Sequence, residues 1–430
     1  MKDFSDASGK TMPEIVIIGG GAAGMMLAAR LCDAGLSERV LLIEKNASLG
    51  KKLAITGKGR CNVTNDCGMQ DFLENVPTNA RFLYSAYAAL PPRELMAFFE
   101  AHGVPLKVER GNRVFPVSDK ASDIVRALDR AVTCRRMQDR VTGLVIENGV
   151  LTGVRTQTHG TVDCRAAAVC TGGLSYPRTG SDGDGYQLAR QAGLEVLPTS
   201  PSLVPLVCAE PYCAQMQGLS LRNTALTMTD TRTGKTVYED FGEMMFTHFG
   251  VTGPMILSAS AHLSRPEEKT YRISLDLKPA LDEKTLDKRI LSDFEKYSNK
   301  DLCNALGDLL PRKMIPVVIA LTGIDERKKI NEITKAERQT LISVLKHFPL
   351  TPIRFRPIDE AIITRGGVSV RGIDPKTMQS KQVKGLYFCG EVLDCDAYTG
   401  GFNLQIAFST AALAASALAA SALAYSEKQQ

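Results

Sequence analysis

The N-terminal region of the chain places two continuous apolar runs on either side of a glycine-rich turn. Residues 15–18 read IVII, a β-branched run that predicts a strand buried on both faces. The turn GGGAAG follows at once and leads into a small-residue stretch, 25–31, that predicts a helix. A second apolar run, 40–43, ends in Glu44. Strand, G-x-G-x-x-G turn, helix, strand and acid in this order predict a βαβ unit that binds a dinucleotide.

Each glycine of this turn has its own expected task. Gly19 allows the tight turn, Gly21 lets the backbone approach the diphosphate, and Gly24 lets the helix pack close to the strand. The diphosphate is expected at the helix N-terminus, where free N–H groups favour negative charge. The carboxylate of Glu44 is placed to bind the adenosine ribose and to repel a 2′-phosphate. The unit predicts cofactor contacts at Gly19, Gly21, Ala22, Ala23, Gly24, Glu44 and Lys45.

Two distant segments indicate which dinucleotide is expected. Residues 385–390 read GLYFCG, Glu391 follows directly, and the glycine pair 400–401 opens a long helix. The segment resembles flavoproteins of the glutathione reductase type, in which a glycine and an acid hold the ribityl chain and a helix N-terminus faces the flavin pyrimidine ring. Residues 168–173, AVCTGG, resemble the ATGG signature of the same proteins. NAD alone would not need these segments, so FAD is predicted, with contacts at Thr171, Gly172, Gly390, Glu391, Asp394, Gly401, Phe402, Asn403 and Leu404.

Longer motifs narrow the resemblance to one family. They are TGKGRCNVTN (Thr56–Asn65), GNRVFPVSDKAS (Gly111–Ser122), TGGLSYPRTGSDGDGY (Thr171–Tyr186), FTHFGVTGP (Phe246–Pro254) and TGGFNLQIAFST (Thr399–Thr410). Over nearly the whole chain the sequence resembles the HI0933-like flavoproteins, which include uncharacterised bacterial proteins, enzymes described as aminoacetone oxidases and a proposed bile-acid reductase. The resemblance therefore implies fold and non-covalent FAD more sharply than substrate. Further cofactor contacts are expected at Lys52, Gly59, Arg60, Cys61, Asn62 and Val141.

The overall pattern predicts an α/β fold with a discontinuous, glutathione-reductase-type Rossmann domain for FAD. This domain is expected at residues 1–195 and 356–430, because both stretches carry cofactor segments. Residues 196–279 contain short alternating runs such as ALTMTD and YRISLDL, which predict a β-rich, barrel-like inserted domain. Residues 280–355 show helical spacing, as in KTLDKRILSDFEKYS, and predict a small helical domain.

Composition changes this picture little. The 430 residues carry a formal net charge of +5, no dense Lys/Arg patch alternates with aromatic residues, and Trp is absent, which argues against a nucleic-acid partner. Residues 1–13 lack the apolar core of a secretory signal. The alanine-rich stretch 411–424 is interpreted as a packed helix and not as a membrane span. A cytoplasmic protein with a small-molecule substrate is expected, and the oligomeric state stays open.

Eleven cysteines raise a competing interpretation. Cys61 and Cys67 lie close to where disulfide reductases keep a redox pair, but their spacing is C-x5-C and not C-x4-C. Cys208 and Cys213 have the C-x4-C spacing but lie in the insertion. No second G-x-G-x-x-G follows a strand, so NADPH would lack its own domain. Dithiol chemistry is therefore the less favoured alternative to reduced, buried thiols, and no Cys/His spacing predicts a metal site.

Three residues are candidates for proton transfer. His248, in FTHFG, can exchange a proton near neutral pH, and capping of a turn is the ordinary alternative. Tyr176 follows the Thr-Gly-Gly turn, and Tyr398 precedes the flavin-facing glycines. A phenol at either position could donate a proton, although packing is an equal alternative.

The sequence thus predicts an FAD-dependent oxidoreductase that acts on a small or medium organic substrate by hydride transfer at flavin N5. Without a second nucleotide domain, two routes for electrons remain. The substrate supplies them, as in amine oxidation with dioxygen, or NAD(P)H docks transiently, as in reduction of an activated double bond. An accessory or redox-sensing flavoprotein that binds a macromolecular partner is the alternative from another class.

Overall fold

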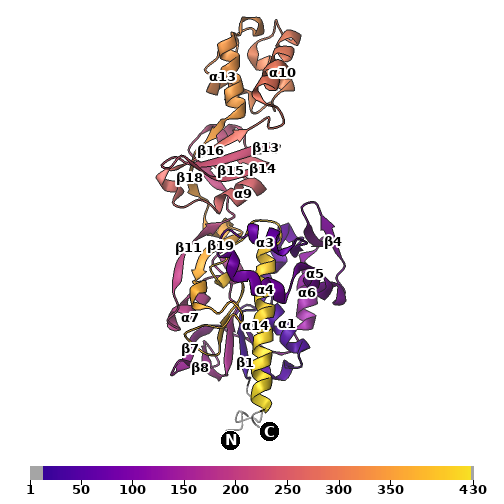
Figure 1. The fold of residues 1–430 in the computed structure, drawn as a ribbon, viewed down its shortest axis with the longest axis vertical. Helices are drawn as coiled ribbons and strands as arrows, with labels where there is room; N and C mark the ends of the chain where they lie inside the picture. The colour runs from indigo at the N-terminus through magenta and orange to yellow at the C-terminus, as the bar shows by residue number, and fades with distance from the viewer. Residues whose placement is uncertain (1–12, 428–430) are drawn as a thin grey trace. The chain divides into compact units, whose positions relative to one another are not determined.

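The computed structural model describes residues 13–427 and divides the chain into two compact units (Figure 1). The first unit runs to Ser202 and resumes at Ala361, and the second unit is Leu203–Glu360. The chain therefore leaves the first unit once and returns to it once.

A five-stranded parallel sheet forms the centre of the first unit, in the order β20-β10-β1-β2-β6. Its strands are β1 (Ile15–Ile18), β2 (Val40–Glu44), β6 (Arg135–Gln138), β10 (Ala166–Val169) and β20 (Leu386–Phe388). Every residue of β1 is buried, because this central strand is apolar on both faces. The carboxyl ends of parallel strands meet at one edge, which is where ligands bind in such sheets.

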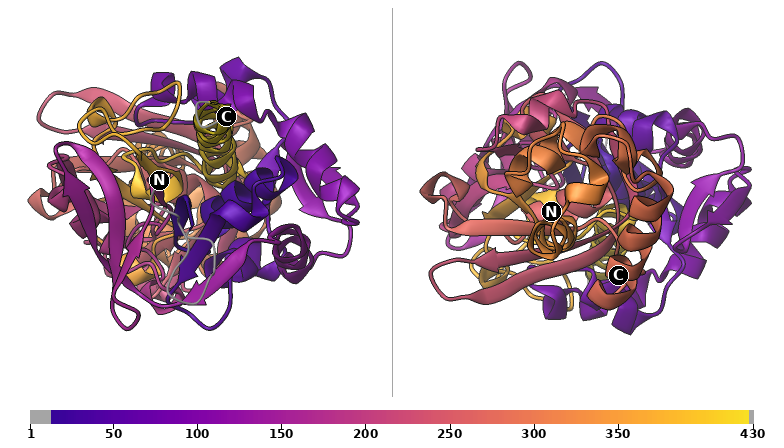
Figure 2. Two further views of the ribbon diagram at one scale, coloured as in Figure 1. Left: turned by 90° about the horizontal axis from the view of Figure 1, so that it is seen from below. Right: turned by 90° about the horizontal axis from the view of Figure 1, so that it is seen from above.

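Two long helices pack together in this unit. They are α1 (Ala22–Asp33), which follows β1, and α14 (Phe402–Glu427), which lies along it (Figure 2). Small side chains such as Ala411 and Ala415 are buried in α14. Among the described residues α14 is the one helix whose length and apolar composition would suit a membrane span, and 56% of its apolar stretch is buried inside the protein. Buried core helices of proteins outside membranes can have the same length and apolar composition.

Smaller elements surround the parallel sheet. One antiparallel sheet contains β3 (Thr64–Asn65), β5 (Arg113–Pro116) and β4 (Leu106–Glu109), and another contains β7 (Val141–Glu147), β8 (Val150–Thr156) and β9 (Thr161–Asp163). The remaining helices of the unit are α2 (Lys51–Ile55), α3 (Met69–Glu74), α4 (Tyr84–Ala89), α5 (Pro92–Ala101), α6 (Ala121–Ala131) and α7 (Asp184–Gln191).

The second unit joins an antiparallel sheet to helices. Seven strands take the order β17-β16-β13-β14-β15-β12-β18. They are β12 (Leu206–Cys208), β13 (Ser220–Asp230), β14 (Lys235–Thr247), β15 (Gly250–Thr252), β16 (Tyr271–Asp276), β17 (Phe348–Leu350) and β18 (Pro352–Phe355). The helices are α8 (Tyr212–Gln215), α9 (Pro254–Ser260), α10 (Glu283–Lys296), α11 (Leu302–Ala305), α12 (Ile315–Thr322) and α13 (Lys335–Lys346). One hydrophobic core serves both parts, since Leu275 of the sheet and Ile342 of α13 belong to the same cluster.

Sequence signals mark the two long helices of this unit. The side chain of Asp282 accepts a hydrogen bond from the backbone N–H of Thr285 and caps α10. Thr334 and Glu337 form a reciprocal capping box at the start of α13. Both helices lie in segments whose spacing predicts a helix.

The unit boundaries differ from the expected ones at both crossings. The strand β11 (Val196–Ser202) pairs with β19 (Ile363–Val368), so the first unit extends beyond residue 195 and resumes at Ala361. The strands β17 and β18 return to the seven-stranded sheet, so residues 348–355 do not belong to the helices. Both differences come from pairings between distant segments, which a local pattern cannot reveal.

Candidate flavin site

The glycine turn between β1 and α1 leaves open space where the diphosphate is expected. Gly19 has a φ of +102°, and a Cβ there would lie 2.7 Å from the carbonyl oxygen of Cys170. A Cβ on Gly24 would lie 1.8 Å from the carbonyl oxygen of Gly19, so close packing requires glycine. A Cβ on Gly21 would meet no atom within 4 Å. This space lies at the first turn of α1, where a diphosphate would be stabilised by free N–H groups.

Glu44 is fixed at the end of β2 by hydrogen bonds. One carboxylate oxygen accepts from the backbone N–H of Gly20 at 2.6 Å. The other accepts from the backbone and side-chain nitrogens of Asn46 at 2.8 and 2.6 Å. Because a carboxylate has about four acceptor positions, room remains for a ribose hydroxyl. Asn46 also donates to the carbonyl oxygen of Thr179 at 3.0 Å, which ties the acid to the loop after the Thr-Gly-Gly turn.

That loop brings two acids to the end of β2. The Nζ atom of Lys45 lies 2.5 Å from the carboxylate of Asp182 and 2.7 Å from that of Asp184. The guanidinium of Arg140 pairs with the same acids at 2.8 and 2.5 Å. Desolvation opposes ionisation of Asp184, but hydrogen bonds from the two cations hold its pKa below the usual range. Lys45, expected to contact the cofactor, thus faces two acids that the sequence analysis missed.

A second network joins four segments around Glu391. The Nζ atom of Lys52 lies 2.6 Å from Oε2 of Glu391 and 2.6 Å from Oγ of Ser175. Oε1 of Glu391 accepts from Oγ of Ser175 at 2.9 Å and from the backbone N–H of Thr364 at 3.0 Å. Oγ1 of Thr364 accepts in turn from the backbone N–H groups of Leu174 and Ser175 at 2.8 and 3.1 Å. Two expected cofactor residues, Lys52 and Glu391, therefore meet as an ion pair.

The loop after α2 follows an unusual backbone path. Gly57, Lys58, Gly59 and Cys61 have positive φ values of 57°, 58°, 85° and 59°. The N–H groups of Arg60 and Cys61 donate to the carbonyl oxygens of Gly57 and Thr56 at 3.2 and 3.0 Å, so the loop closes on itself. Oδ1 of Asn62 is buried and lacks a hydrogen-bond partner within the described part of the chain. A buried acceptor without a partner could accept a hydrogen bond from a bound cofactor.

The side chains of Arg60 and Cys61 are engaged within the protein. Arg60 pairs with Glu109 at 2.5 Å and Asp119 at 2.6 Å, and its guanidinium lies 4.1 Å from the ring centre of Phe115. The thiol of Cys61 is fully buried, and desolvation raises its pKa to about 12. The guanidinium expected at the cofactor thus has two carboxylate partners, and the open polar atom of this loop is Oδ1 of Asn62.

The segment from β20 to α14 passes close to the glycine turn. Gly390 has a φ of +77°, and a Cβ there would lie 2.9 Å from the Cβ of Ala23 in the first turn of α1. The side chain of Asn403 exchanges hydrogen bonds with the backbone of Ala397 at 2.9 and 2.7 Å. The ring of Phe402 packs near that of Phe72. With these side chains engaged, the backbone N–H groups around Gly401–Leu404 are the donors that remain for a ligand.

Two buried acids lie in the same segment. Asp394 accepts a hydrogen bond from Nδ2 of Asn79 at 2.8 Å. Desolvation and the neighbouring charge of Asp396 raise the pKa of Asp394, against the effect of Asn79. Asp396 accepts from Oγ of Ser202 at 2.8 Å, and its Oδ1 has no hydrogen-bond partner among residues 13–427. Asp394, expected at the cofactor, therefore belongs to an acidic pair that the sequence analysis did not identify.

The remaining expected cofactor residues lie after β6 and β10. Thr171 follows β10, and its Oγ1 is buried without a partner in the described structure. Gly172 has a φ of +73°, and a Cβ there would lie 3.0 Å from Oγ of Ser181. Val141 is buried at the start of β7, shortly after β6. Segments after all five parallel strands thus meet at one edge, and their open space and unpaired polar atoms fit a dinucleotide.

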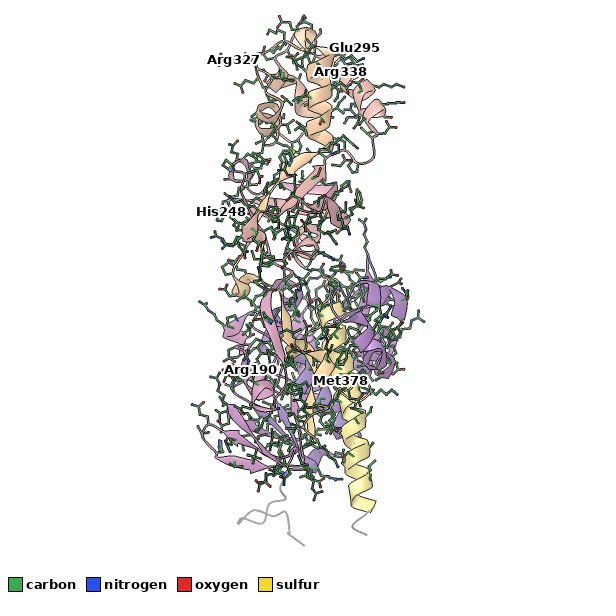
Figure 3. All side chains as sticks on the ribbon, turned by 60° about the vertical axis from the view of Figure 1, so that its left-hand side comes forward. Arg190, His248, Glu295, Arg327, Arg338 and Met378 are labelled. Carbon is green, nitrogen blue, oxygen red and sulfur yellow. The ribbon has the colours of Figure 1, made fainter. Side chains whose placement is uncertain are left out.

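The three candidates for proton transfer divide between the units. Tyr176, in the first unit, has a φ of +53°, which is strained for a tyrosine, and its ring centre lies 5.9 Å from Nζ of Lys52. Tyr398, also in the first unit, is partly buried before α14. His248 lies in the second unit, exposed in the turn between β14 and β15, with its ring edge-on to Phe249 at 5.0 Å (Figure 3).

Of the cysteines considered for dithiol chemistry, Cys61 and Cys67 have different neighbours, whereas the thiols of Cys208 and Cys213 are hydrogen-bonded to each other. The thiol of Cys61 is hydrogen-bonded to Thr56. Burial, followed by the charges of Asp71 and Asp66, raises the pKa of Cys67 to about 11. A raised pKa disfavours the thiolate that dithiol exchange requires. All cysteines of the chain are free thiols in this structure.

Comparisons with known proteins match this chain over most of its length. Residues 13–417 match the family described as HI0933-like protein Rossmann domain. A ribosomal RNA dihydrouridine synthase of Escherichia coli (strain K12) is 31% identical over 406 residues, which cover 93% of this chain and 96% of that protein. A 3-dehydro-bile acid delta(4,6)-reductase of Clostridium scindens is 30% identical over 411 residues, covering 94% and 98%. A ribosomal RNA dihydrouridine synthase of Haemophilus influenzae is 31% identical over 415 residues, covering 94% and 97%.

Solved structures resemble the fold at lower identity. A 3-ketosteroid delta1-dehydrogenase from Sterolibacterium denitrificans gives a TM-score of 0.50 at 13% identity, covering 95% of this chain and 99% of that one. A quinol-fumarate reductase gives a TM-score of 0.50 at 16% identity, covering 96% and 72%. At these low sequence identities the similarity concerns the fold alone.

Proposed function

Because the chain belongs to the HI0933-like family of FAD-dependent oxidoreductases, we propose that it reduces a carbon–carbon double bond conjugated with a carbonyl group, with NAD(P)H as the electron donor. Membership of the family confirms the predicted resemblance, the Rossmann-type α/β fold and the oxidoreductase class. It also supports FAD as the cofactor.

The observation that supports the proposed reaction is the similarity to three relatives over nearly their whole length. A dihydrouridine synthase is named for adding hydrogen across the double bond of a uracil ring. A delta(4,6)-reductase of a 3-dehydro-bile acid is named for removing double bonds near a ring ketone. In both substrates the double bond is conjugated with a carbonyl, so a hydride adds at the far carbon while the carbonyl oxygen accepts the developing charge. One reaction class therefore covers both names.

The residues at the edge of the parallel sheet would hold the cofactor. The open space beyond Gly21 suits the diphosphate, and Glu44 suits the adenosine ribose. The segments that carry Glu391 and Lys52 contact the same region through Gly390 and Gly50, and the two residues suit the ribityl side. When bound, FAD supplies hydride transfer at N5. The protein adds orientation of the substrate, exclusion of water and a proton donor.

The proton for the carbon next to the carbonyl is proposed to come from a side chain of this protein. An imidazole exchanges protons readily near neutral pH, which supports His248. Tyr176 follows the Thr-Gly-Gly turn, and its ring centre lies 5.9 Å from Nζ of Lys52, which supports it as a donor on the first unit. Tyr398 is the third candidate. In the balanced reaction the double bond gains one hydride and one proton, and NAD(P)H becomes NAD(P)⁺.

Anaerobic mixing tests the two half-reactions separately. NADH or NADPH should bleach the flavin band of the purified protein, and a conjugated 3-oxo steroid or ribosomal RNA should restore it. The matched control is the saturated product of the same substrate, which should leave the band bleached. If an amine bleaches the flavin while NADH and NADPH do not, the proposal fails and amine oxidation with dioxygen replaces it.

A second candidate concerns the substrate and is favoured by two of the relatives. Both dihydrouridine synthases are named for ribosomal RNA, whereas a small molecule was expected from this sequence. Exposed basic side chains that form no ion pair within the described residues are present on the helical part of the second unit, at Lys284, Lys288, Lys300, Arg312, Arg327 and Lys335. Figure 3 labels Arg327 among them. Acids such as Glu295 alternate with them. Binding of ribosomal RNA that weakens steeply with salt would favour this candidate.

A further inference from the structure

The two segments that carry the ion pair of Lys52 and Glu391 both contact the region of the glycine turn and the first turn of α1. Lys52 is in α2, whose preceding residue Gly50 donates its backbone N–H to the carbonyl oxygen of Gly20 at 2.8 Å. Glu391 follows Gly390, which comes close to the first turn of α1. The two charges therefore approach the cofactor site from two segments that are 339 residues apart in the sequence.

The surroundings hold this pair in one geometry. Oε2 of Glu391 accepts from Lys52, and Oε1 accepts from Ser175 and the backbone of Thr364. The side chains retain exposed fractions of only 20% for Lys52 and 13% for Glu391. Charges at such positions are screened by salt much less than surface charges. Either charge, if left alone, would act strongly on a group bound nearby.

Because the two charges compensate each other, they affect how easily a bound flavin is reduced. Reduction adds negative charge to the ring system, which an unpaired ammonium would favour and an unpaired carboxylate would oppose. Neutral members of the network, such as Ser175, support the geometry without adding charge. We infer that Lys52 and Glu391 act as a compensated charge pair that sets the reduction potential of the bound flavin. This inference rests on the FAD binding proposed above.

Charge-neutralising variants give opposite signs under this inference. Glu391→Gln keeps the side chain near its size and leaves the ammonium uncompensated, so the midpoint potential of the flavin should rise. Lys52→Met leaves the carboxylate uncompensated, so the potential should fall. The double variant should return toward the wild-type value. Equilibration with redox dyes under anaerobic conditions measures each potential on the FAD-loaded protein.

Two controls separate charge from structure. Ser175→Ala removes the hydrogen bonds of this hydroxyl with Lys52 and Glu391 but no charge, and Lys52→Arg keeps the charge, so both should stay near the wild-type potential. Shifts of the same sign in Glu391→Gln and Lys52→Met, or no shift in either, would overturn the inference. If Glu391→Gln fails to fold, the two Lys52 variants still test the inference. The midpoint potential of Lys52→Met should then lie below that of Lys52→Arg, and a higher or equal value would overturn the inference.

The proposed reaction can fail independently of this inference. A wild-type protein that holds FAD but reduces no conjugated double bond contradicts the reaction, while the potentials of the variants still test the pair. A wild-type protein that cannot be loaded with FAD contradicts both.

Discussion

The carboxylate of Asp139, at the end of β6, accepts a hydrogen bond from Nδ1 of His159 at 2.6 Å. The same oxygen accepts from the backbone and hydroxyl of Thr158 at 3.1 and 2.7 Å. Desolvation alone would raise the pKa of Asp139, but these hydrogen bonds hold it well below the usual range. One buried carboxylate thus fixes the turn between β8 and β9 to the parallel sheet.

Replacement of Asp139 should therefore destabilise the fold in a pH-dependent way. Because the folded pKa is lowered, its stabilisation is present above the unfolded value of about 3.9 and is lost as pH falls toward the folded value. Asp139→Asn should lower the free energy of unfolding by about 1.5–3 kcal/mol near neutral pH, and by less in acid. Urea unfolding of the wild type and the variant, once near neutral pH and once in acid, measures this loss of free energy. Asp129→Asn, at an exposed ion pair with Arg136, is the control and should change little; equal losses at both positions would contradict this account.

Two glycines of the turn should fail in different ways. A Cβ at Gly21 meets no atom within 4 Å, so Gly21→Val should fold but lose FAD, because its side chain enters the space for the diphosphate. A Cβ at Gly24 would lie 1.8 Å from the carbonyl oxygen of Gly19, so Gly24→Val should lower the melting temperature of the apoprotein itself. Thermal unfolding and FAD titration distinguish them. Full flavin content in Gly21→Val would show that the diphosphate lies elsewhere.

Removal of the imidazole of His248 tests its proposed role in proton transfer. The side chain is exposed and forms no hydrogen bond within residues 13–427, so His248→Ala should leave thermal stability and flavin content nearly unchanged. The substrate half-reaction should slow by about 10² to 10⁴. Stopped-flow kinetics on equal amounts of flavin measure this. An unchanged rate would transfer the role to Tyr176 or Tyr398, whose Phe variants are the next test.

The thiols should behave as reduced, unpaired groups. Burial raises the pKa of Cys61 to about 12 and that of Cys67 to about 11, so both should react slowly with alkylating reagents near neutral pH. Thiol titration of the denatured protein should give the same count before and after mild reduction. A gain of two thiols that disappears in Cys67→Ser would revive the dithiol alternative.

Local patterns in the sequence were sufficient for the central part of the fold. The run 15–18, the glycine turn and Glu44 are neighbours in sequence and in space, so their order predicts β1, α1 and β2 directly. The segments at Thr171 and Glu391 lie far apart along the chain, but each follows a strand of the same parallel sheet. Their meeting at one edge follows from the geometry of parallel strands.

The features that could not be predicted from the sequence are contacts between segments that lie far apart along the chain. The acids that face Lys45 and Arg60 come from residues 109–184, and no spacing rule links them to the glycine turn. The pairing of β11 with β19 moves the unit boundaries for the same reason. The ion pair of Lys52 with Glu391 joins two residues that were each expected at the cofactor, but their direct contact required the structure.

Anaerobic reoxidation of the NADPH-reduced or NADH-reduced protein by a conjugated substrate tests the central claim most directly. The account predicts that the flavin band returns in proportion to the substrate added, and that mass spectrometry finds a product heavier by two hydrogen atoms. A flavin that stays bleached with both the 3-oxo steroid and ribosomal RNA, but recovers at once with dioxygen, would contradict it.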